Sequence, residues 1–64
     1  MKIKLSPREL KPGVIAVEAV VTPSGQILAP AGAELTRQII NKMKLYHVDS
    51  ASVDSEDPIV KQIL

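Results

Sequence analysis

One stretch of this 64-residue chain, residues 36–46 with the sequence TRQIINKMKLY, has the hydrophobic period of a helix and decides the fold around it. Apolar residues recur in it at helical spacing, and polar residues occupy most of the opposite face. The apolar stripe consists of Ile39, Ile40, Met43 and Tyr46. Thr36 is a residue type that caps helix N-termini, and lysines lie near the other end, where the helix dipole favours cations. We therefore predict an amphipathic helix over residues 36–46.

The residues before this helix have the composition of strands separated by turns. Residues 14–21, VIAVEAVV, are rich in β-branched side chains and predict a single strand. Glu18 lies at an even position, so we expect the odd positions to face the core, namely Ile15, Val17, Ala19 and Val21. Residues 26–29 are expected to return as the hairpin partner. The helix should then bury its stripe against Ile15, Val17 and Leu28.

Proline–glycine pairs mark the turns between these segments. Pro12-Gly13 fits the centre of a type II turn, and residues 22–25 and 29–32 fit type I turns. Alternation of Lys with Ile3 and Leu5 predicts a short edge strand at the N-terminus. A returning strand is expected to use Val48, Ala51 and Val53, and a final helical turn to begin at residues 57–58.

The predicted architecture is a small α+β domain in which one amphipathic helix packs on a mostly antiparallel sheet, in the order β-β-β-α-β. We expect residues 1–64 to form a single domain, with a core over residues 8–53 and a short tail or turn over residues 54–64. A domain of this size buries little apolar surface, which favours oligomerisation or attachment to a larger domain.

The composition excludes several classes of function. Eight Lys and Arg balance seven Asp and Glu, giving a net charge of +1 and no general attraction to nucleic acid or anionic membranes. Tyr46 is the one aromatic residue, so stacking platforms for single-stranded nucleic acid are missing and nucleic acid is not an expected partner. No apolar run approaches the length of a membrane span or a signal peptide, so we expect a cytoplasmic protein without a membrane role.

The chain lacks a recognisable catalytic or metal-binding constellation. There is no cysteine, and the one histidine, His47, lies just beyond the predicted helix. It could act as a base or ligand, but we interpret it as the residue that ends the helix, near the C′ position, where histidine tolerates a positive φ. The acidic residues at 54–57 match no calcium loop. We predict no enzyme activity, no catalytic or metal-binding residues and no cofactor.

Two groups of residues are candidates for binding. The first is basic and lies at the N-terminus, where it could contact an anion or a nucleotide: Lys2, Lys4, Arg8 and Lys11. The second is apolar and could form an interface with another protein or a second copy of the chain, as in a homodimer: Leu45, Ile59, Val60, Ile63 and Leu64. Leu45 belongs to it because the helical period places this side chain among polar positions.

The order of turns and apolar positions is familiar. It includes the segments LKPGVIA at 10–16, GQIL at 25–28 and AGAELT at 31–36, followed by Ile40, Met43, Val48 and Val53. This pattern, over about residues 8–53, resembles the small N-terminal domain that precedes the catalytic region of many bacterial HD-GYP cyclic di-GMP phosphodiesterases. Where that family has a glycine after the helix, this chain has His47, and the acid of its first strand is displaced by one residue to Glu18.

No position matches the His-Asp pair or the GYP segment of that family, so no catalytic residue carries over. The resemblance implies a non-catalytic accessory or interaction module of bacterial signalling, free-standing or part of a longer protein. A small anion- or nucleotide-binding module that uses the N-terminal basic residues is the alternative.

Overall fold

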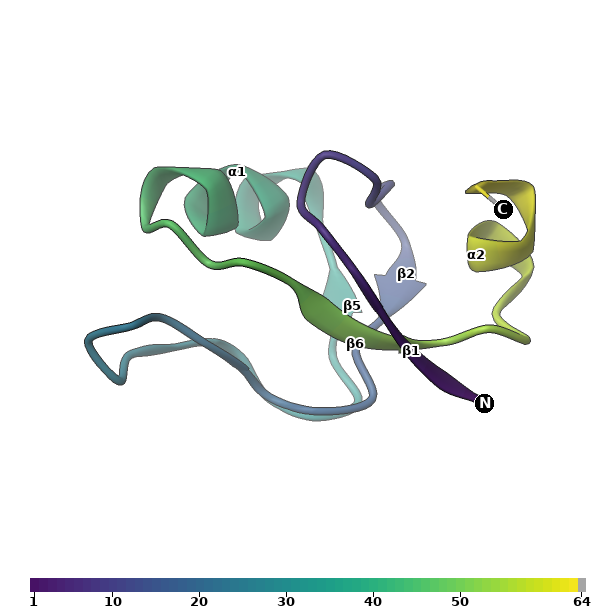
Figure 1. Cartoon of the computed structure of the whole chain (residues 1–64), viewed down its shortest axis with the longest axis horizontal. Helices are drawn as coiled ribbons and strands as arrows, with labels where there is room; N and C mark the ends of the chain where they lie inside the picture. Colours follow the sequence, from purple (N-terminus) through teal and green to yellow (C-terminus); the bar gives the residue numbers. More distant parts are fainter. Residues whose placement is uncertain (64) are drawn as a thin grey trace.

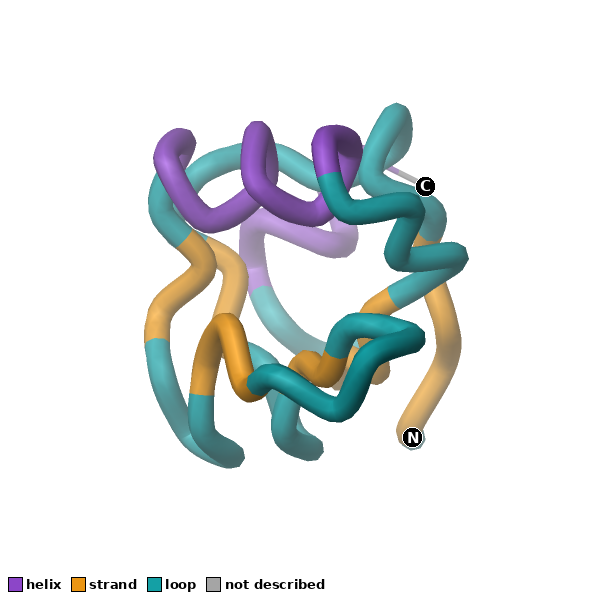
Figure 2. The backbone as a smooth tube through the Cα atoms, turned by 90° about the vertical axis from the view of Figure 1, so that its left-hand side faces the viewer, coloured by secondary structure: helices purple, strands orange, loops and turns teal. Residues whose placement is uncertain are grey.

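The computed structural model describes residues 1–63 and has the α+β composition predicted from the sequence (Figure 1). Its elements are β1 (Lys2–Leu5), β2 (Val14–Ile15), β3 (Val20–Val21), β4 (Ile27–Ala29), β5 (Glu34–Leu35), α1 (Arg37–Leu45), β6 (Ala51–Asp54) and α2 (Pro58–Ile63). Figure 2 shows the helices on one side of the molecule and the strands on the other.

All of the strand pairs are antiparallel. β1 pairs with β6, β2 with β5, and β3 with β4. A single bridge between Ala16 and Val53, together with a hydrogen bond from the Val17 N–H to the Ser52 carbonyl at 2.9 Å, attaches the β2 segment to β6. The first and last strands are therefore neighbours, and the middle of the chain completes the layer beside them.

The single strand predicted over residues 14–21 is wrong in two respects. The chain bends at Val17 and Glu18, so the segment forms two short strands, β2 and β3. Its even positions, Val14, Ala16 and Val20, are buried, whereas Ile15, Val17, Ala19 and Val21 are exposed. The expectation that the odd positions face the core rested on Glu18. This residue lies in the bend and pairs with Lys2 at 3.2 Å, so its exposure does not indicate which face of the strands is buried.

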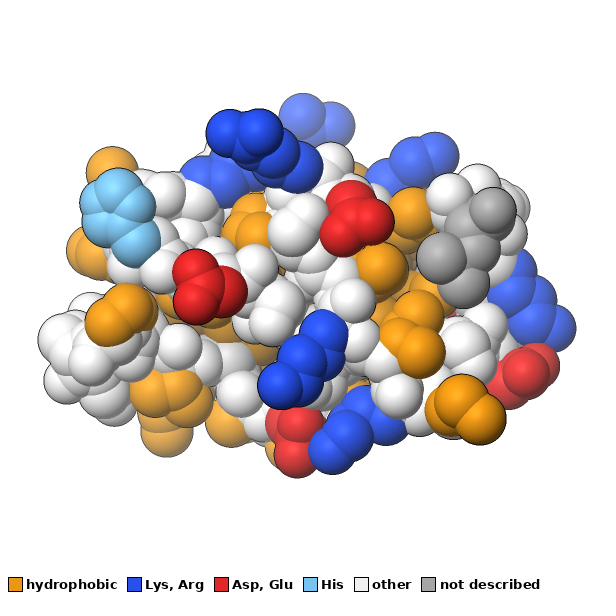
Figure 3. Space-filling view, in the orientation of Figure 1, with side chains coloured by type: hydrophobic (Ala, Val, Ile, Leu, Met, Phe, Trp, Pro, Cys, Tyr) orange, Lys and Arg blue, Asp and Glu red, His pale blue; other side chains and the backbone are white. Residues whose placement is uncertain are grey.

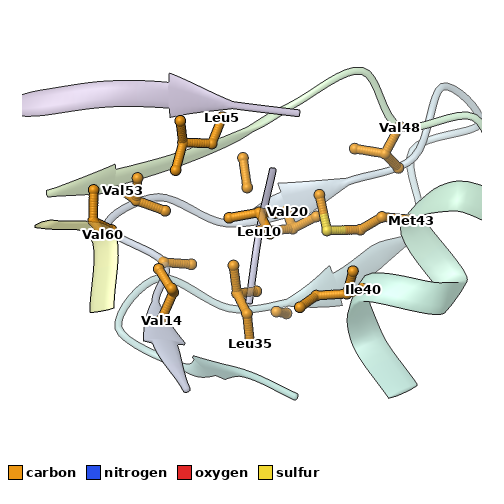
Figure 4. Close-up of a cluster of buried hydrophobic side chains, with 13 residues drawn as sticks. Leu5, Leu10, Val14, Val20, Leu35, Ile40, Met43, Val48, Val53 and Val60 are labelled. Carbon is orange, nitrogen blue, oxygen red and sulfur yellow. The ribbon is translucent and has the colours of Figure 1, made fainter. Parts of the chain in front are cut away.

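A single cluster of apolar side chains fills the space between the helices and the strands (Figure 4). The largest fully buried side chains in it are Leu35, Met43, Val14, Val53 and Val60. Helix α1 packs on β4 and β5, and not on the exposed Ile15 and Val17 as predicted. Ile40 and Met43 supply its buried face, while Ile39 is half-buried.

Both ends of α1 agree with the sequence. The Thr36 hydroxyl accepts a hydrogen bond from the Ile39 N–H at 3.3 Å, as an N-cap does. At the other end His47 has a φ of 60°, the Val48 N–H bonds the Met43 carbonyl at 2.9 Å, and the His47 N–H bonds the Lys44 carbonyl at 3.4 Å. These two bonds form a Schellman motif, which confirms His47 as the residue that ends the helix.

The turns differ in detail. Gly13 has a φ of 105°, as the third position of a type II turn requires. The Gly25 N–H bonds the Thr22 carbonyl at 2.9 Å, which closes the predicted turn over residues 22–25. The turn predicted over residues 29–32 is shifted by one residue, because the Ala33 N–H bonds the Pro30 carbonyl and the Gly32 N–H bonds Ala16 instead.

The C-terminal tail is an integral part of the structure. Val60 of α2 is completely buried, and Leu5 of β1 is buried too, so the core extends beyond the predicted limits of residues 8–53. The Asp57 carboxylate accepts hydrogen bonds from the Ile59 N–H at 2.9 Å and from the Ile15 N–H at 3.1 Å. It therefore joins the start of α2 to the β2 segment.

Candidate interaction surfaces

The C-terminal end of α1 presents two large apolar side chains to solvent. Leu45 is 68% exposed and Tyr46, the helix C-cap, is 41% exposed. Leu45 projects from the polar face, as the helical period predicts. Tyr46 follows the last helical residue, and so it leaves the buried stripe to which the sequence assigned it. Together they form a small apolar surface outside the core.

The two parts of the predicted apolar interface lie at different ends of the molecule. In Figure 1 the C-terminal end of α1, with Leu45, is on the left and α2 is on the right. Val60 is fully buried, and Ile59 and Ile63 are half-buried against the core. Leu64 lies outside the described residues. Of the predicted set, Leu45 is the side chain that the described fold leaves available to a partner.

A second exposed apolar pair lies on the β3–β4 hairpin. Val21 and Ile27 are register partners across the two strands, and Ile27 is 62% exposed. This pair was not predicted, because the alternation of apolar residues placed Val21 among the core positions. The bulge between Val20 and Val21 changes the register at this point, a feature that alternation of apolar residues does not predict.

The four basic residues predicted for anion binding do not form one site. Lys2 pairs with Glu18, and Lys2 and Lys4 lie on β1, opposite Asp54 and Ser52 of β6. Arg8 and Lys11 belong to the segment that connects β1 to β2, which lies at the top of Figure 1, away from the N-terminus. The fold therefore separates the strand lysines from Arg8 and Lys11.

Arg8 instead lines a groove together with residues from the other half of the chain. This groove has a volume of about 480 Å³ and lies between the turn after β1 and the C-terminal end of α1. Its floor consists of the buried Pro7, Met43 and Val48. Exposed polar side chains surround the floor, and these are Arg8, Lys44, His47 and Asp49, with the half-buried Ser6.

A smaller hollow of about 220 Å³ lies further along the helix and has Lys44 in common with the first. Leu10 and Ile40, both buried, form its floor, while Arg37 and Lys44 are its cationic side chains. Lys44 lines both hollows, and the 6–12 segment runs antiparallel to α1 over them. We call the two hollows together the α1 groove. The sequence does not indicate this groove, because its walls come from segments about thirty residues apart.

The α1 groove is predominantly cationic. Helix α1 contains no acidic residue. Lys and Arg side chains gather along the top of Figure 3, over α1 and the segment that connects β1 to β2. The carboxylate of Glu9 accepts hydrogen bonds from the Ser6 N–H and hydroxyl at 3.0 Å each, which lowers the pKa of Glu9. The ion pairs found among residues 1–63 involve the Met1 amine, Lys2 and Lys61, and none involves a cation of the groove.

The acidic residues at 54–57 are already engaged by the protein. Asp54 accepts a hydrogen bond from the Glu56 N–H and pairs with the Met1 amine, each at 2.9 Å, and these contacts lower its pKa. Glu56 pairs with Lys61 at 3.1 Å, and Asp57 bonds two backbone N–H groups. Within the described part of the chain, no three potential metal-ligating side chains converge.

Comparison with protein-family models, with characterised proteins and with solved structures found no match to this chain. Over residues 1–63, neither helix has the length and apolar character needed to cross a bilayer.

Proposed function

We propose that this chain is a non-catalytic module that binds another protein through the C-terminal end of α1. The observation that carries the proposal is the exposure of Leu45 and Tyr46 next to each other, beside a groove with an apolar floor. Tyrosine is enriched among the residues that carry the binding energy of protein interfaces, and apolar side chains exposed together mark interaction sites. A further support is His47, whose backbone ends the helix, a structural role that accounts for the chain's one histidine without catalysis.

The charge around this surface favours a different protein over a second copy. A two-fold dimer through Leu45 would place Lys42 and Lys44 of one copy close to the same residues of the other, because a two-fold interface uses the same surface twice. Like charges placed together at an interface oppose association. We therefore propose a partner whose docking surface carries the opposite charge.

We further propose, from the resemblance of residues 8–53 alone, that the module belongs to bacterial signalling of the HD-GYP type. On this proposal it acts in the cytoplasm as an accessory to a catalytic region on the same chain or on another one. The turn glycines and the apolar positions that carry the resemblance define the shape of the module. The groove and the exposed Leu45 would supply its contact with that region.

A module that binds a small anion or nucleotide is the second candidate. The cationic rim of the α1 groove favours it, with Arg8 retained from the predicted set and Lys44 added. The strand lysines contribute less to this candidate, because Lys2 already pairs with Glu18. Titration with cyclic di-GMP, followed by the amide signals of residues around the groove, tests this candidate directly.

Site-specific photocrosslinking tests the proposed interaction in cells. A benzophenone amino acid replaces Leu45 in one variant and Glu18 in a matched control; the Glu18 side chain is exposed but lies on the bend before β3. We expect one discrete adduct from position 45 that is heavier than the chain by the mass of another protein. Adducts of the same mass and yield from both positions, or no adduct from position 45, would contradict the proposal. An adduct of twice the chain mass would indicate a homodimer.

A further inference from the structure

We infer that the α1 groove receives a short, extended, acidic segment of the partner protein, with carboxylates on the groove's cations and apolar side chains on its floor. This inference rests on the proposed function, since it specifies the partner's chemistry. It assigns the binding contacts to Arg8, Arg37, Lys44 and the floor residue Met43. The surface formed by Leu45 and Tyr46 then lies at one end of the bound segment.

The dimensions of the groove fit a peptide. Its lining runs along the helix from Arg37 to Lys44, which is about 10 Å at 1.5 Å per helical residue, and continues past the helix end to His47 and Asp49. An extended chain rises about 3.3 Å per residue, so the groove accommodates about four or five residues. The 6–12 segment forms the opposite wall throughout this length. Two hollows in a row along one helix match a linear segment better than a compact ligand.

The chemistry of the groove specifies that segment. Its floor is apolar and buried, comprising Pro7, Leu10, Ile40, Met43 and Val48. Its exposed rim carries three cations, Arg8, Arg37 and Lys44, and one carboxylate, Asp49, at the end near His47. In an extended peptide, alternate side chains point to opposite sides. A sequence that alternates acidic and apolar residues therefore directs one set to the floor and the other to the rim.

The state of the cations supports an external anionic partner. Lys2 and Lys61 have carboxylate partners within the chain, at 3.2 and 3.1 Å, whereas the ion pairs found in residues 1–63 leave out the three groove cations. The carboxylate of Glu9, which follows Arg8 in the chain, accepts its hydrogen bonds from Ser6. In a second copy the acidic residues Asp54, Glu56 and Asp57 already bind backbone N–H groups, the Met1 amine and Lys61, which makes them poorer partners for these cations than the free carboxylates of another protein.

The inference is tested by NMR titration of the labelled chain with a synthetic acetylated peptide, Glu-Leu-Glu-Leu-Glu. Gln-Leu-Gln-Leu-Gln and Lys-Leu-Lys-Leu-Lys serve as matched peptides, and pyrophosphate and a short oligothymidylate as phosphate probes. We expect the acidic peptide to shift the signals of Arg8, Ile40, Met43 and Lys44 and to bind more tightly than all other probes. Its affinity should fall several-fold when salt is raised from about 0.05 to 0.5 M, because charge attraction is screened.

Charge reversal on the protein gives the matched comparison. Lys44→Glu is expected to weaken binding of the acidic peptide about fivefold, since an exposed attraction is replaced by repulsion. Lys4→Glu makes the same change in net charge on β1, outside the groove, and should alter the affinity less than about twofold. Both side chains are exposed, so both variants should retain the wild-type spectrum elsewhere.

The outcomes separate this inference from the proposed function. If the acidic peptide shifts Leu45 and Tyr46 but not the groove, the segment assignment is wrong and the interaction module stands. If the uncharged or basic peptide binds as tightly, or Lys4→Glu weakens binding as much as Lys44→Glu, the inference is overturned. If pyrophosphate or the oligonucleotide binds the groove more tightly than every peptide, a phosphate-binding role replaces both proposals.

Discussion

Gly13→Ala is the substitution that most directly tests the packing of α2 on the rest of the fold. Gly13 has a φ of 105°, and a Cβ at this position would lie 2.6 Å from the Cδ1 atom of Ile59. The left-handed conformation costs alanine about 1–2 kcal/mol. Moving the Ile59 side chain out of its rotamer adds about 0.5–1.5 kcal/mol. We expect a total loss of about 1.5–3.5 kcal/mol from the free energy of unfolding.

Gly25→Ala is the matched control. Gly25 has a φ of 93°, and no atom lies within 4 Å of the added Cβ. This variant should therefore lose about 1–2 kcal/mol from the backbone conformation alone. Both changes reduce the entropy of the unfolded chain similarly, so this contribution cancels in the comparison. The difference between the two variants measures the contact between the Pro12-Gly13 turn and α2.

A third variant isolates that contact further. Ile59→Val removes the Cδ1 atom and should cost about 0.5–1 kcal/mol, because Ile59 is only half-buried. Combined with Gly13→Ala, the loss should be smaller than the sum of the two single losses by about 0.5–1.5 kcal/mol. Urea denaturation followed by circular dichroism measures the wild type and all four variants. If Gly13→Ala is no more destabilising than Gly25→Ala, and the double variant is additive, α2 does not pack on the turn as described.

Three further predictions concern the core, the helix end and pH. Ile40→Ala should cost about 2–5 kcal/mol and lower the melting temperature by many degrees, because this is a large part of the about 3–10 kcal/mol that stabilises a 64-residue domain; melting within a degree or two of wild type would show that this core assignment is wrong. His47→Gly should preserve or raise the melting temperature, since glycine adopts a φ of 60° without strain, and added zinc should not shift either protein; a zinc-dependent rise confined to the wild type would contradict this. Hydrogen bonds hold the pKa values of three carboxylates, Glu9, Glu18 and Asp54, below their ordinary values. The donors are Ser6 for Glu9, Ser52 and then Lys2 for Glu18, and the Glu56 N–H for Asp54. Their contribution is present above about pH 4.5 and is lost as pH falls through the lowered values, so the urea midpoint should decrease between about pH 5 and pH 3, and less so in Glu9→Gln.

Local signals in the sequence predicted the helix and its ends. The stripe around Ile40 and Met43, the Thr36 hydroxyl and the unusual residue at His47 each depend on neighbours within a few positions. Such signals survive folding because the atoms that satisfy them belong to the same segment. The same holds for the hairpin formed by β3 and β4, whose turn is closed by Thr22 and Gly25.

The strand faces and the groove could not be predicted in this way. Odd and even positions of residues 14–21 are both apolar, except at Glu18, so the local pattern does not show which side of the strand is buried. That side is decided by distant partners, because Val14 pairs with Leu35 and Ala16 forms a bridge with Val53. The groove depends on the placement of Arg8 against Lys44, and nothing near either residue indicates the other. The buried state of Val60 follows from its packing on the core, whereas the sequence showed only an apolar tail.

The pairing of β1 with β6 has a consequence for the order of folding. It joins Lys2 to Asp54, so the chain must close a loop of about fifty residues before this pair forms. Closing such a loop costs about 3–4 kcal/mol of chain entropy. The contacts between two four-residue strands offset this free energy only when the intervening segments are already packed, because packing shortens the loop that remains to be closed. We therefore expect the hairpin and α1 to form early and the terminal strands to join last, making the two ends of the chain exchange their amide hydrogens together. Equal protection of the Ile3 and Val53 amides in hydrogen exchange would show that the termini open as one unit.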